Sequence, residues 1–292
     1  MAKYTWSEVF MSCEGEGPYT GWPTLYIRYT GCNFQCRGFN NPEGLDTTSI
    51  EVLGFDPKDY NNLKNIPLIT KGCDSIYSWD QKFSHMWKSD DENVLTELVM
   101  NTIPYGQWNH PITGHPTILS ITGGEPLVKW KNIPILLNHN NFEDLEIVLF
   151  ETNCSVPIND NFITDLNNWI TSGYNRKVVW SNSPKLSVSG EEWNRAIRPD
   201  VAIKQTYVKS YEQYFKFVCG PNDRDFDEVS NAMRQYHSIG ISHKTPVYIM
   251  PVACQQSDQT NITAQVAKMC IERGYIYCHR THLEIFGNGV GT

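Results

Sequence analysis

The chain has 292 residues, of which 40% are hydrophobic and 12% aromatic, and its 24 basic and 32 acidic residues give a net charge of −8 at pH 7. This composition can bury a core and excludes disorder as the dominant state. The negative charge disfavours direct binding to nucleic-acid phosphates, and the sequence contains no apolar run as long as a membrane span or a signal-peptide core. We therefore expect a cytoplasmic protein with no direct nucleic-acid or membrane role.

Short apolar runs alternate with amphipathic helical patterns, which is typical of βα units around a parallel sheet. We predict strands over 24–30, 117–122, 145–151, 177–181, 214–218, 247–250 and 275–278. Helices are predicted over 131–138, 162–170, 225–237 and 262–273, the last ending at Gly274. The stretches 37–72 and 101–116 contain many turn-forming residues and are expected to be surface excursions or insertions.

One further helix is predicted after residue 88. Ser89 and Glu92 have the spacing of a capping box at its start. The apolar residues that follow at three- and four-residue spacing would share one face, and they are Val94, Leu95, Leu98 and Val99.

Glycines and polar residues follow the C-terminal ends of the predicted strands. They occupy positions 31–36, 123–126, 152–153, 182–185 and 279–282. Because the C-terminal ends of parallel strands in an α/β barrel share one face, we expect these groups to converge into one site.

Three of the nine cysteines are candidate metal ligands. Cys32 and Cys36 lie in a loop just after a predicted strand, and Cys73 is the third candidate. Three thiolates can bind three irons of a [4Fe-4S] cluster and leave the fourth iron open to another ligand. Alternatively, these cysteines are buried small hydrophobes, or they bind zinc with a histidine such as His85. The spacing alone leaves these alternatives open.

Two motifs, Cys32-x3-Cys36 and Gly123-Gly124-Glu125-Pro126, each follow a predicted strand and resemble the radical S-adenosylmethionine (SAM) superfamily. Other motifs occur in the order of its 7-carboxy-7-deazaguanine synthase (QueE) family. They are residues 8–21, 73–79, 151–153, 183–185, 216–218 and 282–288. The resemblance therefore extends over most of the chain.

The resemblance implies an α/β fold of one radical SAM domain over 1–292, built as a modified, incomplete (βα) barrel with insertions. The family has its third cysteine shortly after the second, so 37–72 would be an insertion between the second and third cluster cysteines. Glu14 stands where the family usually has Gln. A carboxylate keeps an acceptor there but loses the amide donor unless it is protonated.

The implied activity is that of a carbon–nitrogen lyase. It would convert 6-carboxy-5,6,7,8-tetrahydropterin to 7-carboxy-7-deazaguanine with loss of ammonia, in 7-deazapurine and queuosine biosynthesis. The implied cofactors are a [4Fe-4S] cluster, SAM and Mg²⁺. An electron donor such as flavodoxin and a homodimeric assembly are implied as well.

The resemblance also implies the roles of individual residues. The cluster ligands would be Cys32, Cys36 and Cys73, and Ser75 would bind Mg²⁺. The SAM contacts would be Asp74, Gly123, Gly124, Glu125, Ser183, Pro184 and Lys185. The substrate contacts would be Cys13, Glu14, Gly15, Glu16, Arg28, Thr122, His282 and Thr292. No catalytic side chain beyond the cluster and the cofactor is implied.

Most of these residues also have a purely structural interpretation. Gly123-Gly124 would be a plain turn, Lys185 a solvated surface residue, and Arg28 the partner of Glu16 in a structural salt bridge. His282 would be an exposed residue after an edge strand, and we expect His279 and Arg280 to lie on the surface.

Two other functions fit the same cysteines. A radical SAM activating enzyme would abstract hydrogen from a glycine of a partner protein, and it would not need Arg28 or the loop at 13–17 for a carboxypterin. A zinc-stapled, non-catalytic binding domain would use the three cysteines for structure alone.

Overall fold

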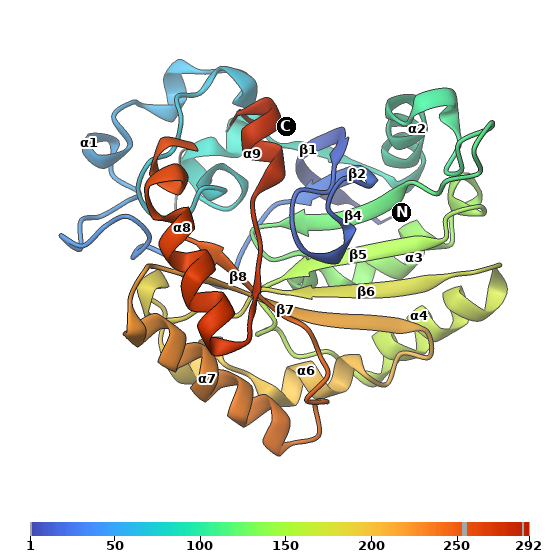
Figure 1. Cartoon of the computed structure of the whole chain (residues 1–292). Helices are drawn as coiled ribbons and strands as arrows, with labels where there is room; N and C mark the ends of the chain where they lie inside the picture. The colour runs from blue at the N-terminus through green and yellow to red at the C-terminus, as the bar shows by residue number, and fades with distance from the viewer. Residues whose placement is uncertain (1, 253–255, 288, 292) are drawn as a thin grey trace.

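A computed structural model describes residues 2–252, 256–287 and 289–291, with the side chains of 256–261 left undescribed. The described strands form one nine-stranded sheet in the order β3-β1-β2-β4-β5-β6-β7-β8-β9 (Figure 1). They are β1 (Tyr4–Cys13), β2 (Pro23–Tyr29), β3 (Lys88–Asp90), β4 (Ile118–Gly123), β5 (Ile147–Thr152), β6 (Lys177–Asn182), β7 (Tyr211–Cys219), β8 (Val247–Pro251) and β9 (Ile276–Tyr277).

Strand direction divides the sheet into two parts. From β2 through β4 to β9 all neighbours are parallel, whereas β1 is antiparallel to both β2 and β3. Within the described residues no pairing joins the edge strands β3 and β9. The sheet is therefore open, and the predicted incomplete (βα) barrel is confirmed.

The α-helices are α1 (Ile50–Leu53), α2 (Glu92–Thr102), α3 (Ile133–Leu137), α4 (Asp160–Ser172), α5 (Trp193–Ala196), α6 (Pro199–Gln205), α7 (Asp223–Ser238), α8 (Gln256–Arg273) and α9 (Thr281–Phe286). Short 3₁₀ turns lie at Gly17–Tyr19, Pro57–Asp59, Leu63–Asn65, Ile76–Ser78, Gln81–Met86, Pro104–Gly106, Pro126–Asn132, Asn140–Phe142 and Ser187–Ser189. No described helix combines the length and the apolar character that crossing a membrane requires.

All seven predicted strands are present, with ends displaced by a few residues. Strand β1 was not predicted, because the pairing register shifts between Trp6 and Glu8 and this irregularity breaks the period-two alternation. The predicted helices 162–170, 225–237 and 262–273 correspond to α4, α7 and α8, and α8 ends just before Gly274, which has a φ of 74°. The predicted helix 131–138 is split between a 3₁₀ turn and α3.

The predicted capping box at the start of α2 is wrong. Asp91 is the N-cap, because its side chain accepts a hydrogen bond from the Val94 N–H, while Ser89 pairs with Thr5 in the ladder between β1 and β3. Leu95 and Val99 are buried as expected, but Val94 is half exposed. The helix is thus rotated relative to the expected apolar face.

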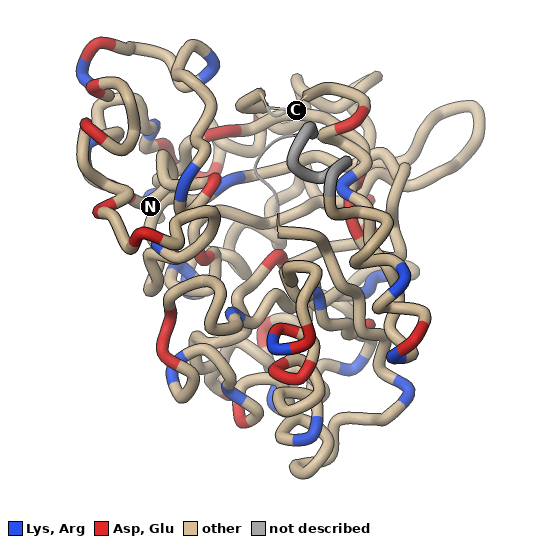
Figure 2. Tube along the Cα trace, turned by 60° about the vertical axis from the view of Figure 1, so that its left-hand side comes forward, with Lys and Arg blue, Asp and Glu red and all other residues tan. Residues whose placement is uncertain are grey.

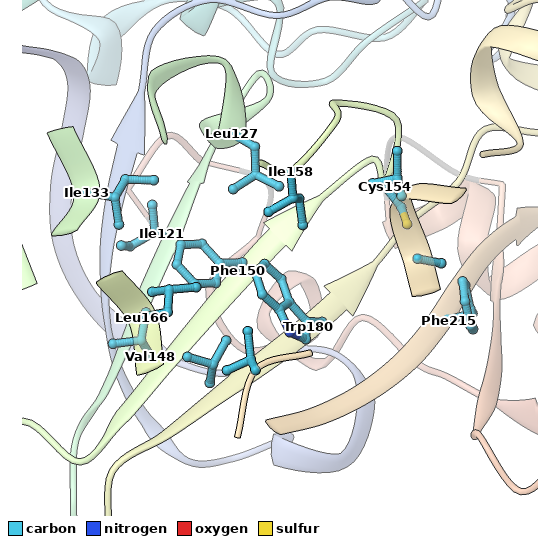
Figure 3. Close-up of a cluster of buried hydrophobic side chains, with 14 of the residues drawn as sticks. Ile121, Leu127, Ile133, Val148, Phe150, Cys154, Ile158, Leu166, Trp180 and Phe215 are labelled. Atoms are coloured by element: carbon cyan, nitrogen blue, oxygen red, sulfur yellow. The ribbon is translucent and has the colours of Figure 1, made fainter. Parts of the chain in front are cut away.

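The two faces of the sheet differ in chemistry because successive side chains of a strand point to opposite sides. On the outer face, Ile121, Phe150 and Trp180 pack with Leu166 of α4 in the main core (Figure 3). On the inner face the lower layer is apolar and includes Leu149, Val179 and Tyr214. The layer nearer the C-terminal strand ends carries polar side chains, which form the site described below.

Segment 37–72 is more than a surface excursion, because it shares a second small core with the residues that follow it. Phe55, Leu63 and Ile69 of the segment pack with Ile76 and Phe83. Its place beside the C-terminal helix α9 is visible in Figure 1. The segment therefore has apolar side chains that fix it against the site.

We expect Phe150→Ala to lower the free energy of unfolding by about 3–5 kcal/mol, because the substitution leaves a cavity in a close-packed core. The Phe150 ring stacks on Trp180 with ring centroids 4.8 Å apart, and both side chains are fully buried. Urea-induced unfolding under reducing conditions measures the change. Tyr174→Ala is the control, since that side chain is 82% exposed and its loss should change stability by less than about 0.5 kcal/mol. Equal effects of the two variants would contradict the packing described.

Candidate active site

A cavity of about 260 Å³ lies at the C-terminal ends of the parallel strands. All five groups that were predicted to converge contribute to its lining, with Cys32, Gly123, Thr152, Ser183 and Arg280 as examples. The inner-face side chains of the strands form its floor, and they are Arg28, Thr122, Glu151, Ser181 and Lys216. The prediction that these five groups converge into one site is thus confirmed.

The three candidate cysteines lie together in the lining of this cavity. Cys32, Cys36 and Cys73 line it and share an apolar cluster with Phe34 and Ala196. The loop is held from outside, because Glu191 accepts hydrogen bonds from the N–H groups of Gln35 and Cys36, each at 2.8 Å. Cys32 and Cys36 therefore sit on a fixed loop, and they line the same cavity as Cys73.

Cys73 reaches Cys36 because segment 37–72 closes on itself. The Gly72 N–H donates a 2.7 Å hydrogen bond to the Phe39 carbonyl, so the chain returns to the point where it left. Gly72 has a φ of 78°, and a Cβ there would lie 2.8 Å from the fully buried Thr47. Glycine is thus required at the closure for both conformation and space.

The cysteine thiols are strongly held in the neutral form. Burial raises the pKa of Cys32 to about 12 and that of Cys73 to about 11, and it raises the pKa of Cys36 as well. The nearby Lys185 ammonium opposes these increases. Metal ions displace thiol protons, so the pocket favours ionisation only with a cation bound.

The described residues contain no group of three His, Cys, Asp or Glu side chains close enough to hold one metal ion. A [4Fe-4S] cluster does not need such closeness, because each cysteine binds a different iron. His85, the histidine considered for a zinc site, does not help the zinc alternative: its Nε2 lies 2.8 Å from the Tyr60 carbonyl, and it does not line the cavity.

The Gly123-Gly124 turn packs directly on the cysteine loop. A Cβ on Gly124 would lie 2.6 Å from the Gly31 carbonyl oxygen and 2.7 Å from the Cys32 Cβ. The Glu125 N–H donates to the same carbonyl at 3.0 Å. The turn is therefore a close contact between two site loops, rather than a plain turn.

Glu125 does not line the cavity. Its buried carboxylate accepts hydrogen bonds from the Leu127 N–H at 3.0 Å, the Thr152 hydroxyl at 2.9 Å and the Asn153 N–H at 2.6 Å. Burial raises its pKa to about 7 despite these donors. Its geometry suits holding the turn against the end of β5.

Among the other predicted SAM contacts, Ser183, Lys185 and Asp74 line the cavity. Pro184 is buried and does not line it. Lys185 Nζ donates to the Ser183 hydroxyl at 3.1 Å and is half buried, so it is not the solvated residue of the structural interpretation. Asp74 lies next to Ser75, whose hydroxyl donates to its Oδ1 at 3.2 Å.

Arg28 is held in place by a residue of β1. The predicted salt bridge between Arg28 and Glu16 is wrong. Its Nε lies 2.7 Å from Glu8 Oε2, an atom that also accepts from the Tyr77 hydroxyl at 3.0 Å. Glu8 faces Arg28 directly across the antiparallel pair of β1 and β2. Arg28 Nη1 also reaches the Ser75 hydroxyl at 3.4 Å.

Glu16 instead pairs with two other cations. Its Oε2 is 2.7 Å from Lys216 Nζ, and its Oε1 is 3.2 Å from Arg280 Nε. Arg280 also binds Asp74 at 3.1 Å and is only 15% exposed, so the expectation that it lies on the surface is wrong. His279 is as expected nearer the surface, beside Glu284.

His282 lies in α9 and lines the cavity, which excludes the alternative of an exposed residue after an edge strand. Its ring lies directly against Gly15, where a Cβ would collide with Nδ1. The Thr281 N–H donates to the Gly15 carbonyl at 3.0 Å, which ties the C-terminal helix to this loop. Thr292, the last of the expected substrate contacts, is outside the described residues.

Lys216, Glu151 and Arg280 are site residues that received no role in the sequence analysis. Lys216 lies between Phe215 and Phe217 on β7, and a charged residue inside an apolar strand was a usable signal. Arg280 gave no comparable signal, because its burial depends on α9 folding back over the cavity.

A second cavity adjoins the first. The two share Arg28, Asp74, Ser75, Arg280 and His282 as walls. The outer wall of the second cavity is formed by residues 64, 66–69 and 289–291. Segment 37–72 thus borders the end of the site that carries Arg28.

Several curated proteins named 7-carboxy-7-deazaguanine synthase are similar to this chain. Those of Methanopyrus kandleri and Pyrobaculum aerophilum are each 24% identical to it, over 86% and 97% of this chain and 82% and 95% of the relatives. The protein of Rhodopirellula baltica is 23% identical over 98% of this chain and 88% of its own length. No family model matches the chain.

Among solved structures, QueE from Escherichia coli covers 96% of this chain and 95% of its own, with a TM-score of 0.50 and 16% identity. That likeness concerns the fold. The fold class and the resemblance stated from the motifs are both confirmed.

We expect Glu8→Ala to lower the free energy of unfolding by about 3 kcal/mol, because it leaves the Arg28 guanidinium buried without its carboxylate. The double variant Glu8→Met with Arg28→Met should recover part of the loss. Urea unfolding of the set measures the coupling. Glu43→Ala removes an exposed pair of similar length, 2.9 Å to Lys71, and should cost less than about 1 kcal/mol. A loss from Glu8→Ala no larger than this control would contradict the role given to Glu8.

Proposed function

We propose that this chain, which is similar over nearly its whole length to 7-carboxy-7-deazaguanine synthases, is a radical SAM lyase with that activity. It would convert 6-carboxy-5,6,7,8-tetrahydropterin to 7-carboxy-7-deazaguanine with loss of ammonia. The observation that carries the proposal is the meeting of Cys32, Cys36 and Cys73 in the lining of one cavity that Arg28 and Glu16 also line.

The residues present fit a [4Fe-4S] cluster held by Cys32, Cys36 and Cys73. Three buried thiols face one space, and the Phe34 N–H already donates to the Cys32 sulfur at 3.4 Å, as backbone donors do around cluster sulfurs. Lys185 offsets part of the negative charge that three thiolates bring together. The bound cluster and SAM supply the radical chemistry.

We assign SAM to the space between the cysteines and the Gly123-Gly124 turn. The turn brings backbone close to the cysteine loop, with Ser183, Lys185 and Asp74 around it as polar partners. Lys185 is suited to the SAM carboxylate because its ammonium group is partly buried and donates to the neutral Ser183 hydroxyl. Glu125 and Pro184 would act from behind, by holding their loops in place.

The substrate would occupy the Arg28 end of the cavity. Arg28 is the proposed partner of the pterin carboxylate, with Thr122 and His282 beside it. Glu14, Gly15 and Glu16 would contact the opposite edge of the ring, and Cys13 would line it. The proposed role of Thr292 rests on the resemblance alone.

Ser75 is the proposed protein ligand of Mg²⁺. Asp74 is adjacent to it, and Mg²⁺ prefers a few protein or substrate oxygens together with waters. A substrate carboxylate bound to Arg28 would lie near Ser75 and could complete the oxygen ligands of Mg²⁺, because Arg28 Nη1 is 3.4 Å from the Ser75 hydroxyl.

We also propose that residues 1–292 form one radical SAM domain in which 37–72 is an insertion. The closure between Phe39 and Gly72 supports this, because it leaves Cys36 and Cys73 adjacent as if the segment were absent. A flavodoxin-type electron donor, a homodimer, a cytoplasmic location and a role in queuosine biosynthesis are proposed from the resemblance alone.

An anaerobic assay tests the function. The reconstituted chain is incubated with SAM, a reductant and carboxytetrahydropterin, and the products are identified by mass spectrometry. We expect carboxydeazaguanine and SAM cleavage that depends on the pterin. SAM cleavage that is indifferent to the pterin would favour the activating-enzyme alternative instead. Bound zinc without acid-labile sulfide after anaerobic purification would favour the binding-domain alternative.

We expect Cys73→Ala to reduce bound iron and acid-labile sulfide by at least tenfold after anaerobic reconstitution, because two thiolates do not hold the cluster. Iron and sulfide analysis with the visible absorption spectrum provides the measurement. Cys13→Ala is the matched control, since Cys13 lines the same cavity but is not one of the three ligands. Unchanged iron in Cys73→Ala would show that the third ligand is a different residue.

A further inference from the structure

Two carboxyl groups of one short loop face the cavity with very different partners. Glu16 lies between two cations, Lys216 at 2.7 Å and Arg280 at 3.2 Å. Within the described residues, the hydrogen-bond donors to the Glu14 side chain are all neutral. Its Oε1 accepts from the N–H groups of Gly15 at 3.1 Å and of Glu16 at 3.2 Å, and its Oε2 accepts from the Tyr26 hydroxyl at 3.1 Å.

The surroundings of Glu14 disfavour a negative charge. Its side chain is 2% exposed, and no ion pair joins it to a cation in the part of the chain that the structure describes. The titratable and charged groups that face this loop are Glu16, Tyr26, Glu151, Tyr214, Lys216, Cys278, Arg280 and His282. The two nearby carboxylates, Glu151 and Glu16, both oppose ionisation of Glu14. Lys216 favours its ionisation, but this effect is smaller than that of burial.

The two groups therefore differ in protonation at neutral pH. Burial, followed by the charge of Glu151, raises the pKa of Glu14 to about 8. Burial also opposes ionisation of Glu16, but Lys216 and Arg280 outweigh it and hold the pKa of Glu16 well below its usual range. Glu14 is then a neutral acid that can donate a hydrogen bond, while Glu16 is a carboxylate that only accepts.

We propose that Glu14 and Glu16 together read the edge of a lactam substrate, with Glu14 as the donor and Glu16 as the acceptor, and that Lys216 is the positioning residue that decides which of the two is ionised. The proposal deepens the proposed function and rests on it for the identity of the substrate. Its geometric basis is that Lys216 contacts Glu16 and Glu151 but not Glu14 within ion-pair distance.

The chemistry of the edge explains why one acid and one carboxylate are needed. The pyrimidinone edge of a pterin presents a carbonyl acceptor, then a ring N–H donor, then an amino donor. A protonated carboxyl donates to the carbonyl, and a carboxylate accepts from both N–H groups. A ring with the reverse order of donors and acceptors would leave buried polar groups unpaired, which sites of this kind reject strongly.

The position of Lys216 favours a negative charge on Glu16 rather than on Glu14. It extends inward from β7, its side chain is only 4% exposed, and it lies 3.6 Å from Glu151 Oε1 as well as 2.7 Å from Glu16. The Thr122 hydroxyl binds the other oxygen of Glu151 at 2.9 Å, so Glu151 stays on the floor of the cavity. Lys216 thus stabilises charge on Glu16 and leaves Glu14 beside a fixed negative group.

The pH dependence follows from the same arrangement. Below pH 8 Glu14 keeps its proton, and its donor is intact. Above pH 8 it ionises, loses the donor and adds a negative charge beside Glu16 and Glu151. Affinity for the substrate should then fall by about tenfold for each pH unit, since one proton must be taken up on binding.

The test is substrate binding to the reconstituted enzyme with SAM but without reductant, so that no turnover occurs. The dissociation constant for carboxytetrahydropterin is measured from pH 6 to 9.5 for the natural chain and Glu14→Gln. The Gln amide keeps the donor at every pH. We expect the affinity ratio of the two to be nearly constant below pH 7 and to change about fivefold between pH 8 and 9, because the pKa of Glu14 is raised to about 8. Glu97→Gln, an exposed change on α2, should follow the natural chain.

A second measurement does not need the substrate. Protonated carboxyls should give infrared absorption at pH 7, and Glu14→Gln should remove the Glu14 component from it. The component from Glu125, whose pKa is raised to about 7, should remain in both proteins. Lys216→Met should raise the pKa of Glu16, so that its protonated band appears at a higher pH than in the natural chain even with Arg280 still at 3.2 Å, and Lys216→Arg should reverse this shift. A pH-independent affinity ratio, or an infrared spectrum that Glu14→Gln leaves unchanged at pH 7, would overturn the proposal. If the pterin does not bind at all, the proposed function fails, while the infrared spectra still decide the protonation states.

Discussion

The cysteine end of the cavity depends on one backbone hydrogen bond, from Gly72 to the carbonyl of Phe39. It returns the chain to its starting point after a long segment, and Cys73 therefore lies beside Cys36. The entropic cost of closing a loop grows only with the logarithm of its length, so a segment of this size is tolerated. The small core of Phe55, Leu63 and Ile69 offsets part of that cost by burying apolar surface.

The charges inside the barrel are better explained by ligand binding than by stability. Taking an ion pair out of water costs about as much as the pair returns, so burying Glu8 with Arg28 or Glu16 with Lys216 adds little to folding. Acidic and basic residues are otherwise interleaved along the chain (Figure 2). Their concentration around the cavity at the C-terminal strand ends marks the place where a charged, polar ligand would replace the lost water.

The same arrangement links the two ends of the sequence. The loop at 13–17 is covered by the start of α9, through the bond from Thr281 to Gly15 and the contact of His282 with that glycine. Arg280 joins Glu16 to Asp74, and so connects the proposed substrate end with the residue next to Cys73. A change at the C-terminal helix would thus be felt at both the N-terminal loop and the cysteine end.

Much of this fold could be predicted from local patterns. Short apolar runs located the seven parallel strands, and helical periodicity located three of the longer helices, because these elements are buried in a regular core. The positions of glycines and polar residues after the strands located the site. The order of short motifs identified Cys32, Cys36 and Cys73 as neighbours, although no local rule connects residues so far apart.

Only the tertiary structure decided which charges are partners. Arg28 pairs with Glu8 of the antiparallel strand β1, which was not predicted because of its irregular register. Lys216 pairs with Glu16, which lies in a loop far away in the sequence. Arg280 is buried only because α9 folds over the cavity. The sequence by itself thus determined the strands, the location of the site and its ligand-type residues, since these follow from periodicity and topology. Which carboxyl keeps its proton depends on distances between atoms of distant segments, and those distances exist only in the folded chain.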